Sequence, residues 1–240
     1  MPSIRHGRLF LVPNLLGTVP PQDVLPARTI EVARGLTHFV AETPKAARSF
    51  LKTLAPLHAL QAISIEELND RVPPERIHAL LSPALAGRDM GMLSDAGCPG
   101  VADPGALLVA AAHDAGIKIV PLVGPSAVLL ALMVSGMNGQ AFTFHGYLPV
   151  KPDARAKALG SLDDAATRSG STQLFIETPY RNDAMIEAVL ATCRAATRLC
   201  VACDLTLPGE QVISRSIARW RSSSRPTFAK RPAMFVLGSG

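Results

Sequence analysis

The chain has 240 residues, of which 48% are hydrophobic and 18% charged, so its composition is that of a folded globular protein and excludes a disordered segment. The formal net charge of +5 favours an anionic partner only weakly, because many soluble enzymes are equally basic. No secretory signal is visible and no apolar run reaches the roughly 18 residues of a membrane helix, so we expect a cytoplasmic protein that does not bind a membrane.

The first half of the chain alternates between strand-like and helix-like segments. Apolar runs predict strands at residues 8–12, 37–41, 59–64, 90–94 and 117–122. Helical patterns fall between them at residues 27–35, 44–54, 73–87 and 105–116. A bend is expected near Pro83, which lacks the amide hydrogen that a continuous helix needs. Such alternation is typical of a parallel α/β sheet.

The second half also mixes the two kinds of segment. Strands are predicted at residues 141–148, 172–178, 197–205, 211–216 and 233–238. Helices are predicted at residues 124–136, 150–171, 179–193 and 216–223. We therefore predict two α/β domains, residues 1–122 and 123–240, with a mainly parallel sheet in the N-terminal one.

Cys200 and Cys203 form a CxxC pair, which is a common half of a zinc site. A zinc site needs further ligands at suitable spacing, and the sequence has neither a second CxxC nor a clustered histidine pair. The surrounding residues, RLCVACDL, predict a strand, whereas a redox CxxC opens a helix. We therefore interpret these cysteines as structural and predict no metal site.

Three loops follow predicted strands and contain unusual residues. They read PNLLGT (residues 13–18), SDAGCPGVADPG (94–105) and VGPSA (123–127). Ligands of open α/β sheets bind outside the carboxyl ends of the strands, and glycines let the backbone approach them closely. The chain contains neither GxxxxGK[ST] nor a GxGxxG after its first strand, which argues against a polyphosphate ligand.

Six segments carry a family resemblance along nearly the whole chain. They are LVPNLLG, SDAGCPGVADPG, AGIKIVPLVGPSAVLLALMVSG, FTFHGYLP, FIETPYR and AMFVLG, and in this order they resemble the signatures of the tetrapyrrole-methylase superfamily. Within it, the chain is most similar to a branch that methylates a ribose 2′-hydroxyl of a 16S rRNA cytidine. The resemblance implies S-adenosylmethionine (SAM) in a cleft between the two domains, a homodimer, and 16S rRNA or the small ribosomal subunit as partner.

The resemblance also implies which residues contact the cofactor. These are Asn14, Leu15, Leu16, Gly17, Ser94, Asp95, Ala96, Gly97, Ser126 and Ala127. Asp95 or Asp103 is suited to accept a hydrogen bond from the ribose or the ammonium group of SAM. Capping of the turn is the alternative for each of these aspartates.

Glu42 and Glu177 are the candidates for a general base, because each ends an apolar run where partial burial favours a raised pKa. Glu42 is alternatively an acid at a helix N-terminus, and Glu177 is alternatively the ion-pair partner of Arg181. Arg181 is expected to contact substrate phosphate or to be structural, and Tyr180 to stack on a base or to be half-buried. A C-terminal basic cluster is either a phosphate-binding face or a solvated surface; it comprises Arg215, Arg219, Arg221, Arg225, Lys230 and Arg231.

Some positions depart from the pattern of that rRNA branch. Leu15 stands where the branch has a proline, and Cys203 and Leu207 stand where it has an arginine and a lysine suited to contact RNA. The cofactor loops thus match the motifs of that branch more closely than the residues expected to contact the substrate do. Two alternatives stay open: methylation of a small molecule such as a tetrapyrrole, and a non-catalytic SAM-binding module.

Overall fold

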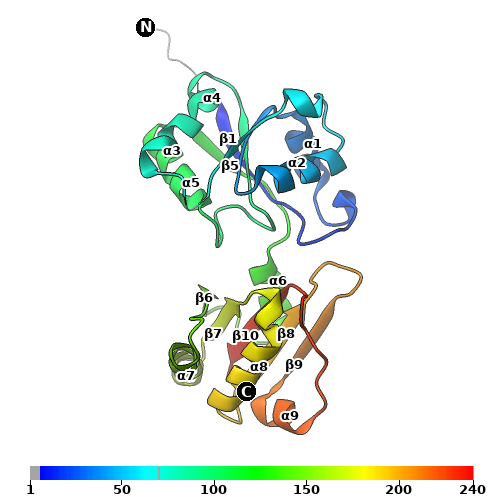
Figure 1. Ribbon diagram of the computed structural model, residues 1–240, viewed down its shortest axis with the longest axis vertical. Coiled ribbons are helices and arrows are strands. Elements are labelled where there is room, and N and C mark those ends of the chain that lie inside the picture. The colour runs from blue at the N-terminus through cyan, green and yellow to red at the C-terminus, as the bar shows by residue number, and fades with distance from the viewer. Residues whose placement is uncertain (1–5, 70, 240) are drawn as a thin grey trace. The chain divides into compact units, whose positions relative to one another are not determined.

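The computed structural model describes residues 6–69 and 71–239 (Figure 1). The chain divides into two compact units, Met1–Ser126 (unit 1) and Ala127–Gly240 (unit 2). Each unit is built on its own five-stranded sheet. Among the described helices, none combines the length and the apolar character needed to cross a membrane.

The sheet of unit 1 is entirely parallel, in the order β3-β2-β4-β1-β5. Its strands are β1 (Arg8–Val12), β2 (His38–Ala41), β3 (Ser64–Glu67), β4 (Met90–Leu93) and β5 (Lys118–Pro121). The predicted parallel sheet is therefore confirmed. Since all five strands run the same way, their carboxyl ends lie at one edge and their amino ends at the other.

Helices cover both faces of this sheet (Figure 1). They are α1 (Ala27–Gly35), α2 (Pro44–Thr53), α3 (Pro74–Leu80), α4 (Ser82–Leu85) and α5 (Gly105–Asp114). Successive side chains of β1 point to opposite faces, so Leu9 packs in the core beneath α3–α5 while Phe10 and Val12 pack beneath α1 and α2. This double burial explains why the strands form almost continuous apolar runs.

The strand predicted at residues 59–64 is placed wrongly. A short 3-10 turn occupies Leu60–Ala62, and β3 follows at Ser64–Glu67. Among the strands that the structure describes, β3 lies at an edge of the sheet and pairs with β2 alone. Its side chains are mostly exposed and therefore give no apolar signal. The predicted bend is confirmed, because α3 ends at Leu80 and α4 begins at Ser82.

Unit 2 has a mixed sheet in the order β6-β7-β10-β8-β9. Its strands are β6 (Phe142–Tyr147), β7 (Thr172–Ile176), β8 (Arg198–Cys203), β9 (Gln211–Ser216) and β10 (Ala233–Gly238). The strands β6 and β7 are parallel, and the other neighbours are antiparallel. The helices are α6 (Ala127–Ser135), α7 (Pro152–Ser169), α8 (Asn182–Thr192) and α9 (Ile217–Ser222).

The two faces of this second sheet are covered unequally. Helices α7, α8 and α9 cover a core that includes Phe175, Trp220 and Phe235, and the rings of Phe175 and Phe235 stack 5.3 Å apart. Helix α6 lies on the opposite face, where Ser214 of β9 donates a hydrogen bond to the carbonyl of Ser135 (2.8 Å). Within the described residues, one nine-residue helix therefore covers this face.

The CxxC pair lies in β8, as predicted. Cys203 packs in the core beneath α7–α9, whereas Cys200, an odd number of residues earlier, points to the other face of the sheet. Both side chains are fully buried. Two thiols on opposite faces of one strand cannot hold the same ion, and residues 6–69 and 71–239 contain no group of three metal-ligating side chains.

We expect Cys193, Cys200 and Cys203 to resist alkylation in the native protein. Burial raises the pKa of Cys193 to about 12 and those of Cys200 and Cys203 to about 11, so these thiols stay protonated at pH 8. The thiolate is the reactive form. Mass spectrometry after iodoacetamide treatment at pH 8 is expected to find only Cys98 modified, and all four cysteines modified in denaturant. Rapid alkylation of Cys200 in the folded protein would contradict this placement.

Candidate cofactor site and active site

Three loops leave the carboxyl ends of neighbouring strands in unit 1. Loop A (residues 13–18) follows β1, loop B (94–104) follows β4, and loop C (122–126) follows β5. Because β1 lies between β4 and β5 in the sheet, these loops emerge side by side. These are the three loops that the sequence predicts as a ligand site, and the structure brings them together.

Asn14 joins loop A to loop B. Its backbone amide donates to the carbonyl of Gly97 (2.9 Å), and its side-chain amide donates to the carbonyls of Ser94 (3.0 Å) and Asp95 (3.1 Å). The hydroxyl of Ser94 donates in turn to the carbonyl of Gly97 (3.0 Å). Asn14 and Ser94 are buried, so both side chains shape the loops from within.

Loop C packs against both other loops through glycines. Gly97 has a φ of 70°, and a Cβ placed there would lie 3.2 Å from Leu16 and 3.5 Å from the carbonyl oxygen of Pro125. A Cβ on Gly124 would lie 2.4 Å from Cβ of Pro13, which is closer than real side chains approach. The backbones of the three loops therefore come as near to one another as they do because these residues lack side chains.

Replacing Gly124 with alanine is expected to destabilise unit 1 by about 1–3 kcal/mol, because the new methyl group overlaps the rigid ring of Pro13. Gly35 is the matched control, since nothing lies within 4 Å of a Cβ there and the residue is in helix α1. Thermal unfolding is expected to show a lower Tm for Gly124→Ala and no loss for Gly35→Ala. Equal Tm values would contradict this close packing of loops A and C.

The outer surface of loop B carries a carboxylate and a small side chain. Asp95 and Ala96 are exposed, and Thr43 donates a hydrogen bond to Oδ2 of Asp95 (2.7 Å). Thr43 follows β2, the strand beside β4, so the loop after β2 also reaches this site. Thr43 is not among the site residues that the sequence motifs indicate. Its place beside Glu42 was the available signal, but only the strand order shows that it meets Asp95.

The remaining predicted cofactor residues are partly accessible. Leu15, Leu16 and Gly17 of loop A are half-buried, as are Ser126 at the end of loop C and Ala127 at the start of α6. Their contact with a cofactor stays a prediction.

Asp103 fills the inside of loop B. Its carboxylate accepts hydrogen bonds from the backbone amides of Gly100 (2.9 Å) and Gly105 (2.7 Å). Burial raises the pKa of Asp103, although these two amides oppose the shift. The turn-capping alternative is thus visible in the structure, and a contact between Asp103 and the cofactor stays a prediction.

The second base candidate belongs to unit 2. Glu177 follows β7, and its Oε1 accepts hydrogen bonds from the backbone amide of Thr178 (2.6 Å) and from Nη2 of Arg181 (2.6 Å). Its side chain is 1% exposed and that of Arg181 is 31% exposed. The expected ion pair is therefore present. The other oxygen, Oε2, is buried and has no hydrogen-bond partner among the described residues.

Two further candidates remain accessible. Tyr180 is 79% exposed, so the half-buried alternative for this residue is not what the structure shows. Glu42, the residue directly after β2, is half-buried and precedes Thr43. The structure therefore places Glu42 near the loops of unit 1 and Glu177, Tyr180 and Arg181 together in unit 2.

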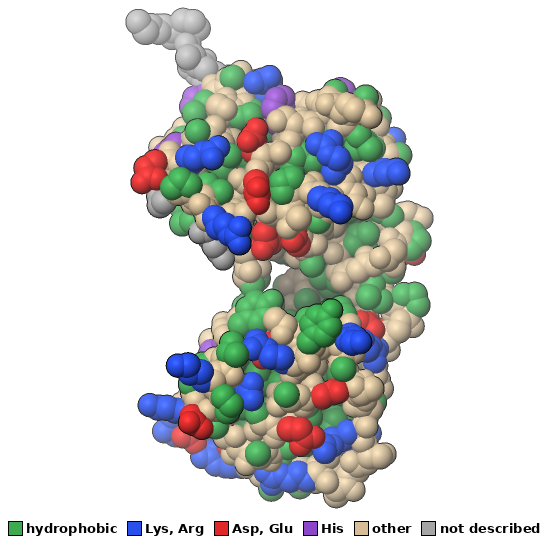
Figure 2. Space-filling view, viewed as in Figure 1, with side chains coloured by type: hydrophobic (Ala, Val, Ile, Leu, Met, Phe, Trp, Pro, Cys, Tyr) green, Lys and Arg blue, Asp and Glu red, His purple; other side chains and the backbone are tan. Residues whose placement is uncertain are grey.

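The C-terminal basic residues are largely engaged within unit 2. Arg221 donates to the carbonyls of Leu190 and Cys193, Arg225 pairs with Glu187, and Arg231 pairs with Asp204; the guanidinium of Arg215 lies over the ring of Trp220. Figure 2 shows Lys and Arg side chains dispersed over the drawn face of each unit. These contacts favour a structural role over a single phosphate-binding face.

Comparison with known families shows the family to which the chain belongs. Residues 21–219 match the model of the family described as Tetrapyrrole (Corrin/Porphyrin) Methylases. The chain belongs to the tetrapyrrole methylase family. Tetrapyrrole methylases are SAM-dependent methyltransferases, and so is this chain. The match covers loops B and C and the segment that contains Glu177.

Named relatives of this tetrapyrrole methylase include two proteins named for the methylation of ribosomal RNA. The chain is 33% identical over 235 residues to Ribosomal RNA small subunit methyltransferase I of Xylella fastidiosa, covering 96% of this chain and 80% of the relative. It is 34% identical over 211 residues to the protein of the same name from Mycobacterium tuberculosis, covering 88% and 70%. The fold is similar to that of the methyltransferase CobJ, with a TM-score of 0.65, 20% identity, and coverage of 98% and 95%.

Proposed function

We propose that this chain binds SAM on loops A, B and C and transfers its methyl group to a ribose hydroxyl of 16S rRNA. The observation that carries the proposal is the joining of the three loops, through Asn14 and the glycines, at the carboxyl edge of a parallel sheet. The relatives named for the small-subunit rRNA support the choice of acceptor. Such a substrate would place the protein in the cytoplasm.

The residues of the three loops suit SAM, which carries an adenine, a ribose, an ammonium group and a carboxylate. The exposed carboxylate of Asp95 is suited to the ribose or the ammonium group, and Thr43 fixes its orientation. Half-buried Leu15 and Leu16 offer an apolar surface suited to an adenine ring. At Gly100, where φ is 84° and a Cβ would meet nothing within 4 Å, the loop leaves open space.

Bound SAM supplies an electrophilic methyl group on a sulfonium. The protein then has to hold the acceptor hydroxyl in line and take up its proton, and good alignment alone supplies much of the catalysis. We propose that the acceptor hydroxyl displaces the side chains that bury Glu177 and donates its hydrogen bond to Oε2, the oxygen that lacks a partner among the described residues. Glu42 remains the alternative base on unit 1.

The neighbours of Glu177 suit an RNA substrate. Arg181 uses Nε and Nη2 to hold Glu177, and its Nη1 donates to no described residue. That atom is therefore suited to a substrate phosphate. Exposed Tyr180 is suited to stack on an unpaired base. We propose these two residues as substrate contacts.

Methylation of a small molecule such as a tetrapyrrole is the second candidate. It is favoured by one observation: Cys203, which stands where the rRNA branch has an arginine, is fully buried in the core of unit 2 and cannot contact RNA. Transfer of labelled methyl groups to ribosomal subunits distinguishes the two candidates.

Isothermal titration calorimetry tests the cofactor part of the proposal. We expect both SAM and its demethylated product to bind, and ligand at one hundred times its Kd to stabilise the fold by about 2.7 kcal/mol. Absence of binding heat and of any rise in Tm at millimolar ligand would contradict the assignment of loops A–C.

We also propose that the protein is a homodimer formed through the thinly covered face of the unit 2 sheet. On that face Met133 of α6 is 75% exposed and Phe142 of β6 is 41% exposed. Exposed apolar patches of this kind mark interaction sites in soluble proteins. A second copy is the occupant that the family resemblance implies.

Replacing Met133 with aspartate is expected to convert the dimer to a monomer, because the new carboxylate would be buried without a partner in the interface. Light scattering after size exclusion gives the molar mass of the native protein and of the variant. A matched change outside this face is Leu57→Asp, at a residue of unit 1 that is 68% exposed. A monomeric native protein would contradict the proposal.

A further inference from the structure

A separate cavity lies at the opposite edge of the sheet in unit 1. His38, Ser64 and Met90, the first residues of β2, β3 and β4, line it together with residues of α3 and α4. Its volume is approximately 330 Å³. Sites for small ligands begin at about 300 Å³. Loops A–C leave the carboxyl ends of the strands, so this cavity is not part of the proposed cofactor site.

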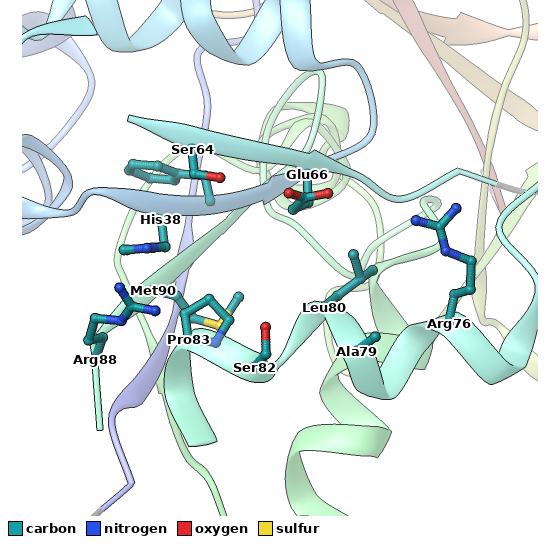
Figure 3. Close-up of a pocket in the computed structure, with 11 residues that line it drawn as sticks. His38, Ser64, Glu66, Arg76, Ala79, Leu80, Ser82, Pro83, Arg88 and Met90 are labelled. Carbon is teal, nitrogen blue, oxygen red and sulfur yellow. The ribbon is translucent and has the colours of Figure 1, made fainter. Parts of the chain in front are cut away.

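The cavity has an apolar floor and a polar rim. Buried Leu80 and Met90 form the floor. Arg88 and His38 lie at one end, Arg76 lies at the other, and Glu66 faces the helices across the space between them (Figure 3). An apolar floor with a few converging polar groups is the usual composition of a small-molecule site.

The charged groups on the rim lack partners within the described part of the chain. Neither guanidinium, of Arg76 or of Arg88, makes a hydrogen bond or ion pair there, and the carboxylate of Glu66 accepts none. Arg88 also lines the hollow beside α1, but the other two arginines of that hollow, Arg8 and Arg28, are paired with carboxylates. The free charges of the cavity are thus available to a ligand.

The end of the cavity that contains Arg88 is firmly built. The backbone amide of Arg88 donates to the carbonyl of Pro83 (3.0 Å). Gly7 packs so closely against Arg88 that a Cβ there would lie 2.1 Å from the carbonyl oxygen of Arg88. The backbone of Arg88 is therefore fixed, so its side chain extends from a defined position.

His38 completes this end of the cavity. Its Nδ1 shares a hydrogen bond with the hydroxyl of Thr37 (3.0 Å), which leaves Nε2 as the ring nitrogen without a partner among the described residues. Burial, reinforced by the positive charge of Arg88, lowers the pKa of His38, so the imidazole is neutral at pH 7. The effect of Arg88 on His38 is consistent with their neighbouring positions in Figure 3.

We propose that this cavity binds a nucleotide, with its phosphate on Arg88 and its base on the apolar floor, where Glu66 accepts a hydrogen bond from an exocyclic amino group. Guanidinium groups bind phosphate through paired hydrogen bonds, and carboxylates accept from the amino group of cytosine. A carboxylate on the rim disfavours a simple anion and favours a ligand with both an acidic and an amino group. The nucleotide is either free or an unstacked residue of single-stranded RNA.

Binding of two probes tests the proposal and identifies the source. Fluorescence anisotropy measures binding of a labelled single-stranded oligocytidylate, and calorimetry measures binding of cytidine 5′-monophosphate. Binding of the mononucleotide supports a free nucleotide as ligand, and binding of the oligonucleotide alone supports an RNA segment. The proposal is overturned if neither probe binds.

Three variants locate the binding. Arg88→Ala is expected to weaken it by about tenfold through loss of the charged hydrogen bonds to phosphate. Ala79→Trp, at an exposed cavity residue of α3, is expected to block the space without removing a charge. Glu66→Ala is expected to remove a preference for oligocytidylate over oligouridylate, because uracil lacks the exocyclic amino group.

The matched control is Arg71→Ala, which removes an exposed arginine of unit 1 that does not line the cavity. It is expected to leave binding within about twofold, as surface changes usually do. Affinity for SAM is expected to be unchanged in all four variants, which separates this proposal from the cofactor site and shows that each variant is folded. Equal losses in Arg71→Ala and Arg88→Ala, or no loss in Arg88→Ala and Ala79→Trp, would overturn the proposal.

Discussion

Replacing Ala96 with tryptophan is expected to weaken SAM binding at least about 100-fold, which corresponds to about 2.7 kcal/mol. Ala96 is exposed on loop B between Asp95 and Gly97, whose carbonyls accept the hydrogen bonds of Asn14 that join loop B to loop A. An indole at this position would fill the space of the proposed cofactor site without entering the core. The Tm in the absence of ligand is therefore expected to stay near that of the native protein, and calorimetry measures the affinity.

Ala110→Trp is the control for this substitution, because Ala110 is exposed on α5, which follows loop B. It adds the same side chain outside the three loops and is expected to leave SAM binding unchanged. A folded Ala96→Trp variant that binds SAM as tightly as the native protein would remove loop B from the site.

Replacing Glu177 with glutamine is expected to lower the rate of methyl transfer by about 10²–10⁴-fold, the range that a general base contributes. Glutamine keeps the shape of the side chain and one carbonyl oxygen for the backbone amide of Thr178. It loses the charge that pairs with Arg181 and the acceptor strength of Oε2. The affinity for SAM, measured by calorimetry, is expected to stay unchanged.

Glu187→Gln provides the matched control. Glu187 also pairs with an arginine of unit 2, Arg225, but its side chain is 66% exposed. Surface ion pairs contribute little, so this variant is expected to keep both its activity and its Tm. If Glu177→Gln lowers the Tm while each folded molecule keeps its activity, Glu177 is a structural residue and the proposed role is wrong.

Burial explains which elements of the fold the sequence predicts well. The run RLFLV predicts β1 because this strand lies inside the sheet and buries side chains on both faces. The edge strand β3, with the sequence SIEE, satisfies its backbone through β2 while its side chains remain mostly exposed. Its position depends on pairing with a distant segment, and hydrophobic periodicity does not record that pairing.

The candidate site can likewise be predicted from the sequence only in part. Loops A, B and C are visible in the sequence because their glycines and prolines interrupt the strand-helix alternation. The inward roles of Asn14 and Asp103 depend on contacts between loops and within loop B, respectively. A sequence motif indicates that such residues belong to the site. It does not distinguish residues that stabilise a loop from residues that contact the ligand. The contact between Thr43 and Asp95 likewise needs the strand order.

The most direct measurement of the central claim is methyl transfer to the ribosome. Purified protein is incubated with methyl-labelled SAM and small ribosomal subunits from a strain that lacks its gene, and the 16S rRNA is digested to nucleosides for mass spectrometry. We predict that label appears in a ribose-methylated nucleoside, and that much less label appears when the Ala96→Trp variant is used at the same concentration of SAM. Label that appears in a base, or no transfer to the subunits by a protein that binds SAM, would contradict the proposed function.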